Sequence, residues 1–243
     1  MKLEVLPVRG MPEILPGMDL GLCISEAIQT SGWTLEPNDI LAVTQKVISK
    51  AEGRIVELPT IEPSPYSAAI ARRMSKDPRL VELILRESRR IVRMRGEVLI
   101  AETHHGFICA NAGVDQSNVD GADTVTLLPK DPDRSARDLA RSLGCGVIIT
   151  DTFGRAWREG LVDVTIGIAG VPPLMDFRGQ VDSYGRPLHV TTLAAADALA
   201  AAAGLTMGKL SRTPAAIIRG FMWNETEATV NSLLRPTERD LFL

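Results

Sequence analysis

The chain of 243 residues has few cysteines, few aromatic residues and no long uninterrupted hydrophobic run. Its three cysteines, Cys23, Cys109 and Cys145, are odd in number and far apart, which argues against a disulfide scaffold or a zinc ribbon. The longest apolar stretch, Leu193–Leu205, contains Asp197 and is too short to cross a bilayer. The N-terminus has no secretory signal. We therefore expect reduced thiols, a cytoplasmic location and no membrane partner.

An excess of charge of one sign is also missing. Lys and Arg number 27 and Asp and Glu number 30, for a net charge of −3, so no positive field is available for nucleic acid and no nucleic-acid partner is expected. The sequence contains no GxxxxGK[ST], GxGxxG, GxSxG or HExxH motif, which disfavours Walker-type NTPases, Rossmann dehydrogenases, α/β-hydrolases and zincins. The hydrophobic content of 45% is ordinary for a globular protein with a core.

Hydrophobic periodicity predicts short strands mixed with helices. Strands are expected at Lys2–Val8, Asp39–Val43, Val98–Glu102, Phe107–Asn111, Gly146–Asp151, Asp163–Ile168 and Ala215–Ile218. Helices are expected over 19–29, in the pattern of 64–95, and over 131–144 and 193–203. Because strands and helices do not alternate regularly, we predict an α+β fold with mixed sheets and flanking helices.

Two groups of basic residues receive structural interpretations. Four arginines crowd the helical pattern of 64–95: Arg86, Arg89, Arg90 and Arg93. We interpret them as a solvated helix face, with a site for an anionic substrate as the alternative. The histidines are not expected to bind metal: His104 and His105 fall in a predicted turn, and His189 at a predicted helix start.

An oxygen-rich loop follows the predicted strand Phe107–Asn111. Asp115 and Ser117 lie there, together with Asn111 and Asn118. Carboxylate and amide oxygens suit hard cations such as Mg²⁺ or Mn²⁺. An Asx-rich turn that satisfies its own backbone is the alternative, and this segment alone favours the turn.

A second polar group follows the apolar strand that begins at Gly146. Asp151 and Thr152 stand at its carboxyl end, where ligand-binding groups are common. Arg155 and Arg158 follow and could grip phosphate or carboxylate oxygens. A capping aspartate with surface arginines is the alternative, but the crowding of acid, hydroxyl and arginine favours a functional site.

Two further segments leave their roles open. Lys50 follows a strand and could supply a point charge for phosphate, or belong to a solvated turn. The polar loop Asp176–Pro187 is long, which indicates either function or a contact between subunits.

Several ordered motifs resemble the coenzyme F420:L-glutamate ligase family, the F420-0:γ-glutamyl ligases. They are Gly10-Met11-Pro12, VISKAEGR at Val47–Arg54, NAGVDQSN at Asn111–Asn118, ITDTFGRAWREG at Ile149–Gly160 and DSYGRPL at Asp182–Leu188. The resemblance runs from Val5 to about Gly220. It implies a ligase domain over 1–220, as one unit or two intimate subdomains, and a tail or linker start over 221–243.

The resemblance implies an activity and an assembly. Family members use GTP, with Mg²⁺ or Mn²⁺, to join L-glutamate to the carboxylate of F420-0, and further γ-glutamyl additions follow. Two divalent ions are expected, with K⁺ as a further cation. The resemblance also implies a fold particular to the family and an intertwined homodimer, with the active site in a groove near the dimer interface.

The resemblance also assigns residues by position. Asp115, Asp151 and Thr152 match divalent-metal ligands, and we expect Asp115, Asp151 and Arg155 to act in catalysis. The expected GTP contacts are Met11, Pro12, Glu13, Ile14, Gln45, Lys46, Lys50, Asn118, Met207, Gly208, Lys209, Leu210, Ser211, Arg212 and Thr213. The chain departs from archaeal relatives at Lys209, where they have a carboxylate.

Two alternatives stand beside this prediction. The chain could be the ligase half of a bifunctional enzyme that continues into a flavin-binding, nitroreductase-like domain. It could also be a non-catalytic relative that binds F420 or a nucleotide, although the presence of both Asp115 and Asp151 favours an enzyme.

Overall fold

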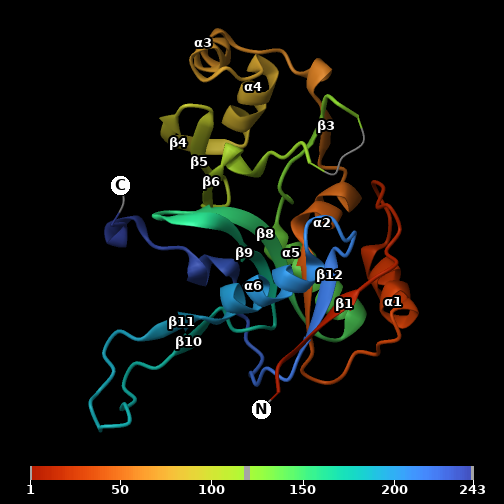
Figure 1. The fold of residues 1–243 in the computed structure, drawn as a ribbon, viewed down its shortest axis with the longest axis vertical. Helices are drawn as coiled ribbons and strands as arrows, with labels where there is room; N and C mark the ends of the chain where they lie inside the picture. The colour runs from red at the N-terminus through yellow and green to blue at the C-terminus, as the bar shows by residue number, and fades with distance from the viewer. Residues whose placement is uncertain (1, 118–120, 242–243) are drawn as a thin grey trace.

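A five-stranded mixed sheet forms the body of the molecule in the computed structural model, which describes residues 2–117 and 121–241 (Figure 1). Its order is β1 (Glu4–Val8), β12 (Ala215–Arg219), β2 (Ile40–Thr44), β8 (Gly146–Arg155) and β9 (Arg158–Ala169). The β2 and β8 strands pair in parallel and the other neighbours pair antiparallel. Thr44, the last residue of β2, is in register with Thr150, and β8 continues beyond this point to Arg155 in its pairing with β9.

Helices cover both faces of this sheet (Figure 1). The α1 helix (Leu20–Thr30) and α5 (Pro132–Leu143) pack on one face, and α6 (Ala195–Met207) packs on the other. The predicted N-cap residues are confirmed: the side chains of Asp19 and Asp131 accept hydrogen bonds from backbone amides in the first turns of α1 and α5. Gly144, with φ of 70°, ends α5 in the left-handed conformation.

A second, smaller region lies beyond the sheet and has its own hydrophobic core, which includes Ile70, Val81 and Leu99. Its helices are α3 (Pro65–Met74) and α4 (Pro78–Arg86). Its strands are β4 (Ser88–Arg95), β5 (Val98–Thr103) and β6 (Ile108–Ala110), paired in that order, and β3 (Ile55–Glu57) with β7 (Thr124–Thr126). The mixed sheets and flanking helices confirm the predicted α+β class.

The helical prediction for 64–95 is wrong at its end. Ser75, in the left-handed conformation, closes α3, and α4 ends at Arg86, so residues from Ser88 form the strand β4. Arg90 therefore lies on a strand, where its Nε donates to Glu102 of β5 at 2.7 Å. The cross-strand partner explains the error, because it is invisible to local periodicity.

The hairpin of β10 (Leu174–Asp176) and β11 (Thr192–Ala194) extends away from the body (Figure 1). The loop between its strands contains His189, so the predicted helix start at His189 is wrong. The helix α6 begins at Ala195, two residues later than predicted, and ends at Met207, four residues later than predicted.

Residues 221–234 pack against the main core instead of leaving it. Val230 is buried, and Phe221, Trp223 and Leu233 contact the same cluster. Short 3₁₀ turns complete the described chain: η1 (Leu58–Thr60), η2 (Asn111–Gly113), η3 (Val230–Leu233) and η4 (Thr237–Arg239). In the part of the chain that the structure describes, no helix combines the length and the apolar character that a membrane crossing needs.

Candidate active site

The polar groups gather where β2 ends and its parallel pairing with β8 stops, at Thr44 and Thr150. In β8, the buried apolar run Val147–Ile149 gives way to Thr150, Asp151 and Thr152. The helix α2 (Gln45–Ala51) starts directly after β2 and carries Lys46 in its first turn. The edge of the sheet thus brings together two segments about a hundred residues apart in the sequence.

Asp115 reaches this edge through a tight turn in the smaller region. Gly113 has φ of +73°, and a Cβ there would lie 2.6 Å from Leu128, so the NAG turn requires glycine at its end. Backbone hydrogen bonds of 3.0 and 2.8 Å then join Asp115 to Thr126. The turn and this bridge hold the Asp115 carboxylate against the α2 helix.

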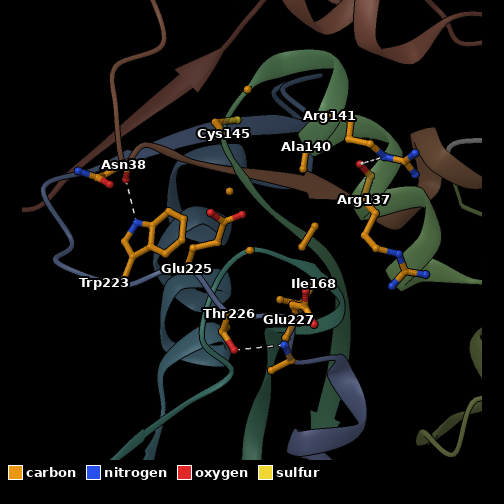
Figure 2. A pocket seen from close by; sticks show the side chains of 15 residues that line it. Asn38, Arg137, Ala140, Arg141, Cys145, Ile168, Trp223, Glu225, Thr226 and Glu227 are labelled. Atoms are coloured by element: carbon orange, nitrogen blue, oxygen red, sulfur yellow. Dashed lines mark hydrogen bonds between the residues drawn. The ribbon is translucent and has the colours of Figure 1, made fainter.

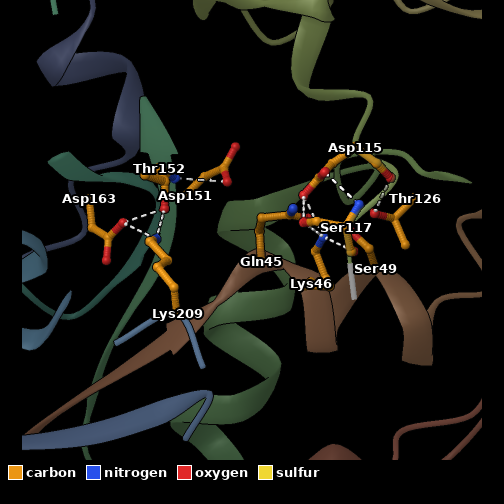
Figure 3. Close-up of polar contacts among 10 residues, drawn as sticks. All are labelled: Gln45, Lys46, Ser49, Asp115, Ser117, Thr126, Asp151, Thr152, Asp163 and Lys209. Atoms are coloured by element: carbon orange, nitrogen blue, oxygen red, sulfur yellow. Dashed lines mark hydrogen bonds and ion pairs between the residues drawn. The ribbon is translucent and has the colours of Figure 1, made fainter. Parts of the chain in front are cut away.

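The first polar cluster consists of Lys46, Asp115 and Ser117 (Figure 3). The Lys46 ammonium forms an ion pair with Asp115 and donates to the Ser117 hydroxyl at 2.9 Å. The Ser117 amide and hydroxyl also donate to the Asp115 carboxylate, at 2.8 and 2.7 Å. Burial raises the pKa of Asp115, but the hydrogen bonds from Lys46 and Ser117 outweigh it and hold that pKa below its usual range.

The second polar cluster consists of Thr152, Asp163 and Lys209 (Figure 3). Thr152 and Asp163 are cross-strand neighbours in the β8–β9 pair, and the Thr152 hydroxyl donates to the Asp163 carboxylate. Lys209, just beyond the end of α6, donates to the Thr152 hydroxyl and to Asp163 Oδ1, the latter at 3.2 Å.

Asp151 lies between the two clusters (Figure 3). Its carboxylate accepts a hydrogen bond from the Thr152 amide at 2.8 Å. Burial raises the pKa of Asp151 to about 7. The hydrogen bond from the Thr152 amide and the positive charge of Lys46 lower that pKa, while the negative charges of Asp115 and Asp163 raise it. Within residues 2–117 and 121–241, no lysine or arginine forms an ion pair with Asp151. The site therefore has a carboxylate whose charge a bound cation would stabilise.

The donor set at Asp115 and Asp151 fits a divalent cation of the Mg²⁺ type. Both are carboxylates, and the negative charge of Asp115 acts on Asp151. Among the described residues there is no group of three or more His, Cys, Asp or Glu side chains arranged to hold a metal. Two carboxylates are nevertheless the usual protein share for Mg²⁺ when substrate phosphates and water complete its coordination.

The predicted nucleotide-contacting residues Gln45 and Lys50 lie on α2, the helix that also carries Lys46. Lys50, in the last turn of α2, is buried and forms an ion pair with Glu13. That pair brings the loop Met11–Ile14 to α2, with Glu13 exposed and Ile14 buried in the core. Gln45 is also buried, and it accepts a hydrogen bond from the Ser49 hydroxyl at 2.8 Å.

Other predicted residues lie apart from these clusters or outside the description. Arg155 is exposed near the tip of the β8–β9 hairpin, and its guanidinium donates to carbonyl oxygens of the same hairpin. In the predicted GTP segment Met207–Thr213, Met207 is the last residue of α6 and is buried in the core, whereas Leu210 is 96% exposed. Asn118 lies outside the described residues.

Two residues that were not assigned a site role from the sequence belong to the clusters: Asp163, which contacts Thr152 and Lys209, and Ser117, which contacts Asp115. Sequence reasoning placed Asp163 at a strand start and gave it no role. Its signal was the strand–turn–strand pattern of residues 146–169, in which a hairpin would bring Asp163 opposite Thr152. Ser117 had been noted only as a member of the oxygen-rich loop.

A separate groove lies at the other end of β8, beside Gly146, about 17 Å along the strand from Asp151. Figure 2 shows the Trp223 indole donating to the Asn38 carbonyl at 2.9 Å on one side of this groove. Glu225 and Arg141 also line it. None of the predicted site residues belongs to its lining, so it is distinct from the clusters above.

The protein is thus of the α+β class, with the carboxylates Asp115 and Asp151 and the ammonium groups of Lys46 and Lys209 gathered beside the main sheet (Figure 3). The model of the F420-0:Gamma-glutamyl ligase family matches residues 10–220, and the chain belongs to that family. It is 45% identical to the coenzyme F420:L-glutamate ligase of Methanothermobacter thermautotrophicus, over 100% of this chain and 99% of that protein. Proteins of the same name from Methanopyrus kandleri and Methanocaldococcus jannaschii are 46% and 37% identical, each over 99% of this chain and 97% of the relative.

Proposed function

We propose that this protein joins L-glutamate to F420-0 in the biosynthesis of coenzyme F420, uses GTP as the energy source, and can extend the product through further γ-glutamyl linkages. The observation that carries the proposal is that Asp115, paired with Lys46, lies close enough to Asp151 for its charge to act on that carboxyl group (Figure 3). The family match and the full-length relatives support the choice of substrates.

The proposed reaction has two steps. A carboxylate oxygen of F420-0 attacks the γ-phosphorus of GTP, the bond to the β-phosphate oxygen breaks, and GDP leaves. The resulting acyl phosphate is then attacked at its carbonyl carbon by the amine of glutamate. Inorganic phosphate leaves, the nitrogen loses a proton, and an amide bond remains. Both steps depend chiefly on alignment and on compensation of phosphate charge.

The protein's own residues supply position and charge in this scheme. Asp115 and Asp151 would hold a Mg²⁺ or Mn²⁺ ion, which when bound neutralises charge on phosphate oxygens. Lys46 and Lys50 are both residues of α2, and their ammonium groups pair with Asp115 and Glu13. In this scheme each ammonium group exchanges its carboxylate partner for a phosphate oxygen. Arg155 would attract the anionic side chain of F420-0 from the hairpin tip. K⁺ remains a proposed further cation.

The proposal includes the intertwined homodimer. The β10–β11 hairpin extends from the body and carries exposed apolar side chains, among them Tyr184 at 86% and Val190 at 85% exposure. A second copy of the chain would remove these surfaces from water. The oligomeric state follows directly from the mass measured by light scattering.

Ligation tests the proposal directly. The protein is incubated with GTP, Mn²⁺, L-glutamate and F420-0, and the products are examined by mass spectrometry for added glutamyl units. Asp115→Asn should abolish the product, whereas Asp138→Asn, which removes an exposed carboxylate on α5, should leave it unchanged. An active Asp115→Asn protein, or an inactive wild type that is folded and binds GTP, would refute the proposal.

A further inference from the structure

One amino group of the chain sits on oxygens that a second metal ion would need. The Lys209 ammonium donates to the Thr152 hydroxyl and to Asp163 Oδ1. Thr152 was predicted from the family resemblance as a metal ligand, so the contact is in direct competition with that role. The residues on this side of the site therefore do not fit an additional divalent ion as they stand.

The contacts leave the Asp163 carboxylate little freedom to turn away from Lys209. Its side chain is only 10% exposed and it accepts a hydrogen bond from the Thr152 hydroxyl. The α6 helix passes so close that a Cβ on Gly204 would overlap Asp163 Oδ2. A divalent ion that approached these oxygens would have to displace the ammonium from a carboxylate fixed on two other sides.

The three carboxylates of the site differ in whether a lysine compensates their charge. Lys46 pairs with Asp115 and Lys209 pairs with Asp163, so three carboxylates face two ammonium groups. Asp151 lies between them (Figure 3) and, among the described residues, forms no ion pair with a lysine or arginine. Asp115 is itself paired with Lys46, but its side chain is 42% exposed against 10% for Asp163, so an ion can reach Asp115 more readily than Asp163.

We infer that Lys209 is the cation of the Thr152–Asp163 side, so that each protomer takes one divalent ion, held by Asp115 and Asp151, and not two. This inference rests on the proposed function for the identity of the first site. Lys209 acts here as a positioning residue, because it fixes Thr152 and Asp163 through its ammonium group and replaces an ion that would otherwise need free access to them.

The number of bound ions tests the inference. Bound Mn²⁺ is counted by electron paramagnetic resonance, with the protein in excess over a hydrolysis-resistant GTP analogue. Three proteins are compared with the wild type: Lys209→Glu, Lys209→Gln and the control Lys2→Gln. Lys2 lies in the first residues of the chain, at the far edge of the sheet, with a side chain 80% exposed. The Lys209 side chain is itself 62% exposed, so its replacement leaves the cores intact.

We expect one Mn²⁺ per site in the wild type and in Lys2→Gln, and two in Lys209→Glu. Lys209→Gln should also gain a second ion, with an affinity at least tenfold weaker than that of the second ion in Lys209→Glu. Two ions in the wild type would overturn the inference, and so would one ion in both Lys209 variants, because Lys209 would then not be what excludes the second. A wild type that binds no Mn²⁺ would overturn it as well. Loss of ligation with one bound ion would instead count against the proposed function alone.

Discussion

The substitution Asp151→Asn should make the metal-free protein more stable while it removes the proposed cation site. Burial and the neighbouring aspartates raise the pKa of Asp151 from 3.8 to about 7. A rise of about 3 pKa units corresponds to a cost of at most about 4 kcal/mol when the group is ionised in the folded state. Asparagine has nearly the same size, and its oxygen can still accept the hydrogen bond from the Thr152 amide, so the substitution removes the cost without opening a cavity.

The sign of this effect depends on pH. A carboxyl group whose pKa is raised by folding favours the folded state most at low pH, where it is neutral in both states. The stability cost of Asp151 should therefore be absent below about pH 4 and grow as the pH rises toward 7. Accordingly, wild type and Asp151→Asn should differ little at pH 4, and the variant should gain about 2–4 kcal/mol at pH 7.

Urea denaturation in a chelating buffer at several pH values measures the difference, with Asp138→Asn as the exposed control. The same Asp151→Asn protein should fail to bind Mn²⁺ and should form no ligation product. A variant that is less stable than wild type at pH 7, or whose gain does not change with pH, would refute the account of Asp151 as a carboxylate kept at an energetic cost for cation binding.

Three further predictions concern other parts of the fold. Gly204→Ala gains up to about 1 kcal/mol of helix propensity, but the added methyl group overlaps Asp163; thermal melting should show net destabilisation, and unchanged stability with normal Mn²⁺ binding would contradict the contact. Arg219→Met leaves Asp39, which is 1% exposed, without its partner, and should cost about 3–5 kcal/mol in urea denaturation, part of which Asp39→Asn should restore. Burial raises the pKa of Cys109 to about 12, so a thiol reagent at pH 8 should label it only after unfolding; rapid labelling of the native protein would disprove this.

The sequence points to Asp115 and Asp151 but not to their surroundings. Asp151 closely follows the apolar run Val147–Ile149, Asp115 follows the predicted strand Phe107–Asn111, and both belong to motifs of the family. Asp163 escaped notice because its partner Thr152 lies across a hairpin, and such pairing depends on register, which a single sequence indicates weakly.

The error over 64–95 has a related cause. Ile91 and Val92 continue the apolar spacing of the preceding helix, so local periodicity favours more helix. The contact between Arg90 and Glu102 instead joins neighbouring strands. The helix ends at Arg86 and the strand begins at Ser88. This change depends on the pairing of β4 with β5, which scales of local helix and strand propensity do not include.

The separation of the hydrophobic interior into two cores has a consequence for substrate affinity. Asp115 follows Val114 of the smaller core, whereas Lys46 precedes Val47 of the larger one. The ion pair between Lys46 and Asp115 therefore also joins the two hydrophobic cores to each other. If metal and nucleotide bind here as proposed, a substitution that separates the two cores, even far from the site, should weaken that binding, and bound ligands should in turn stabilise the contact between the cores.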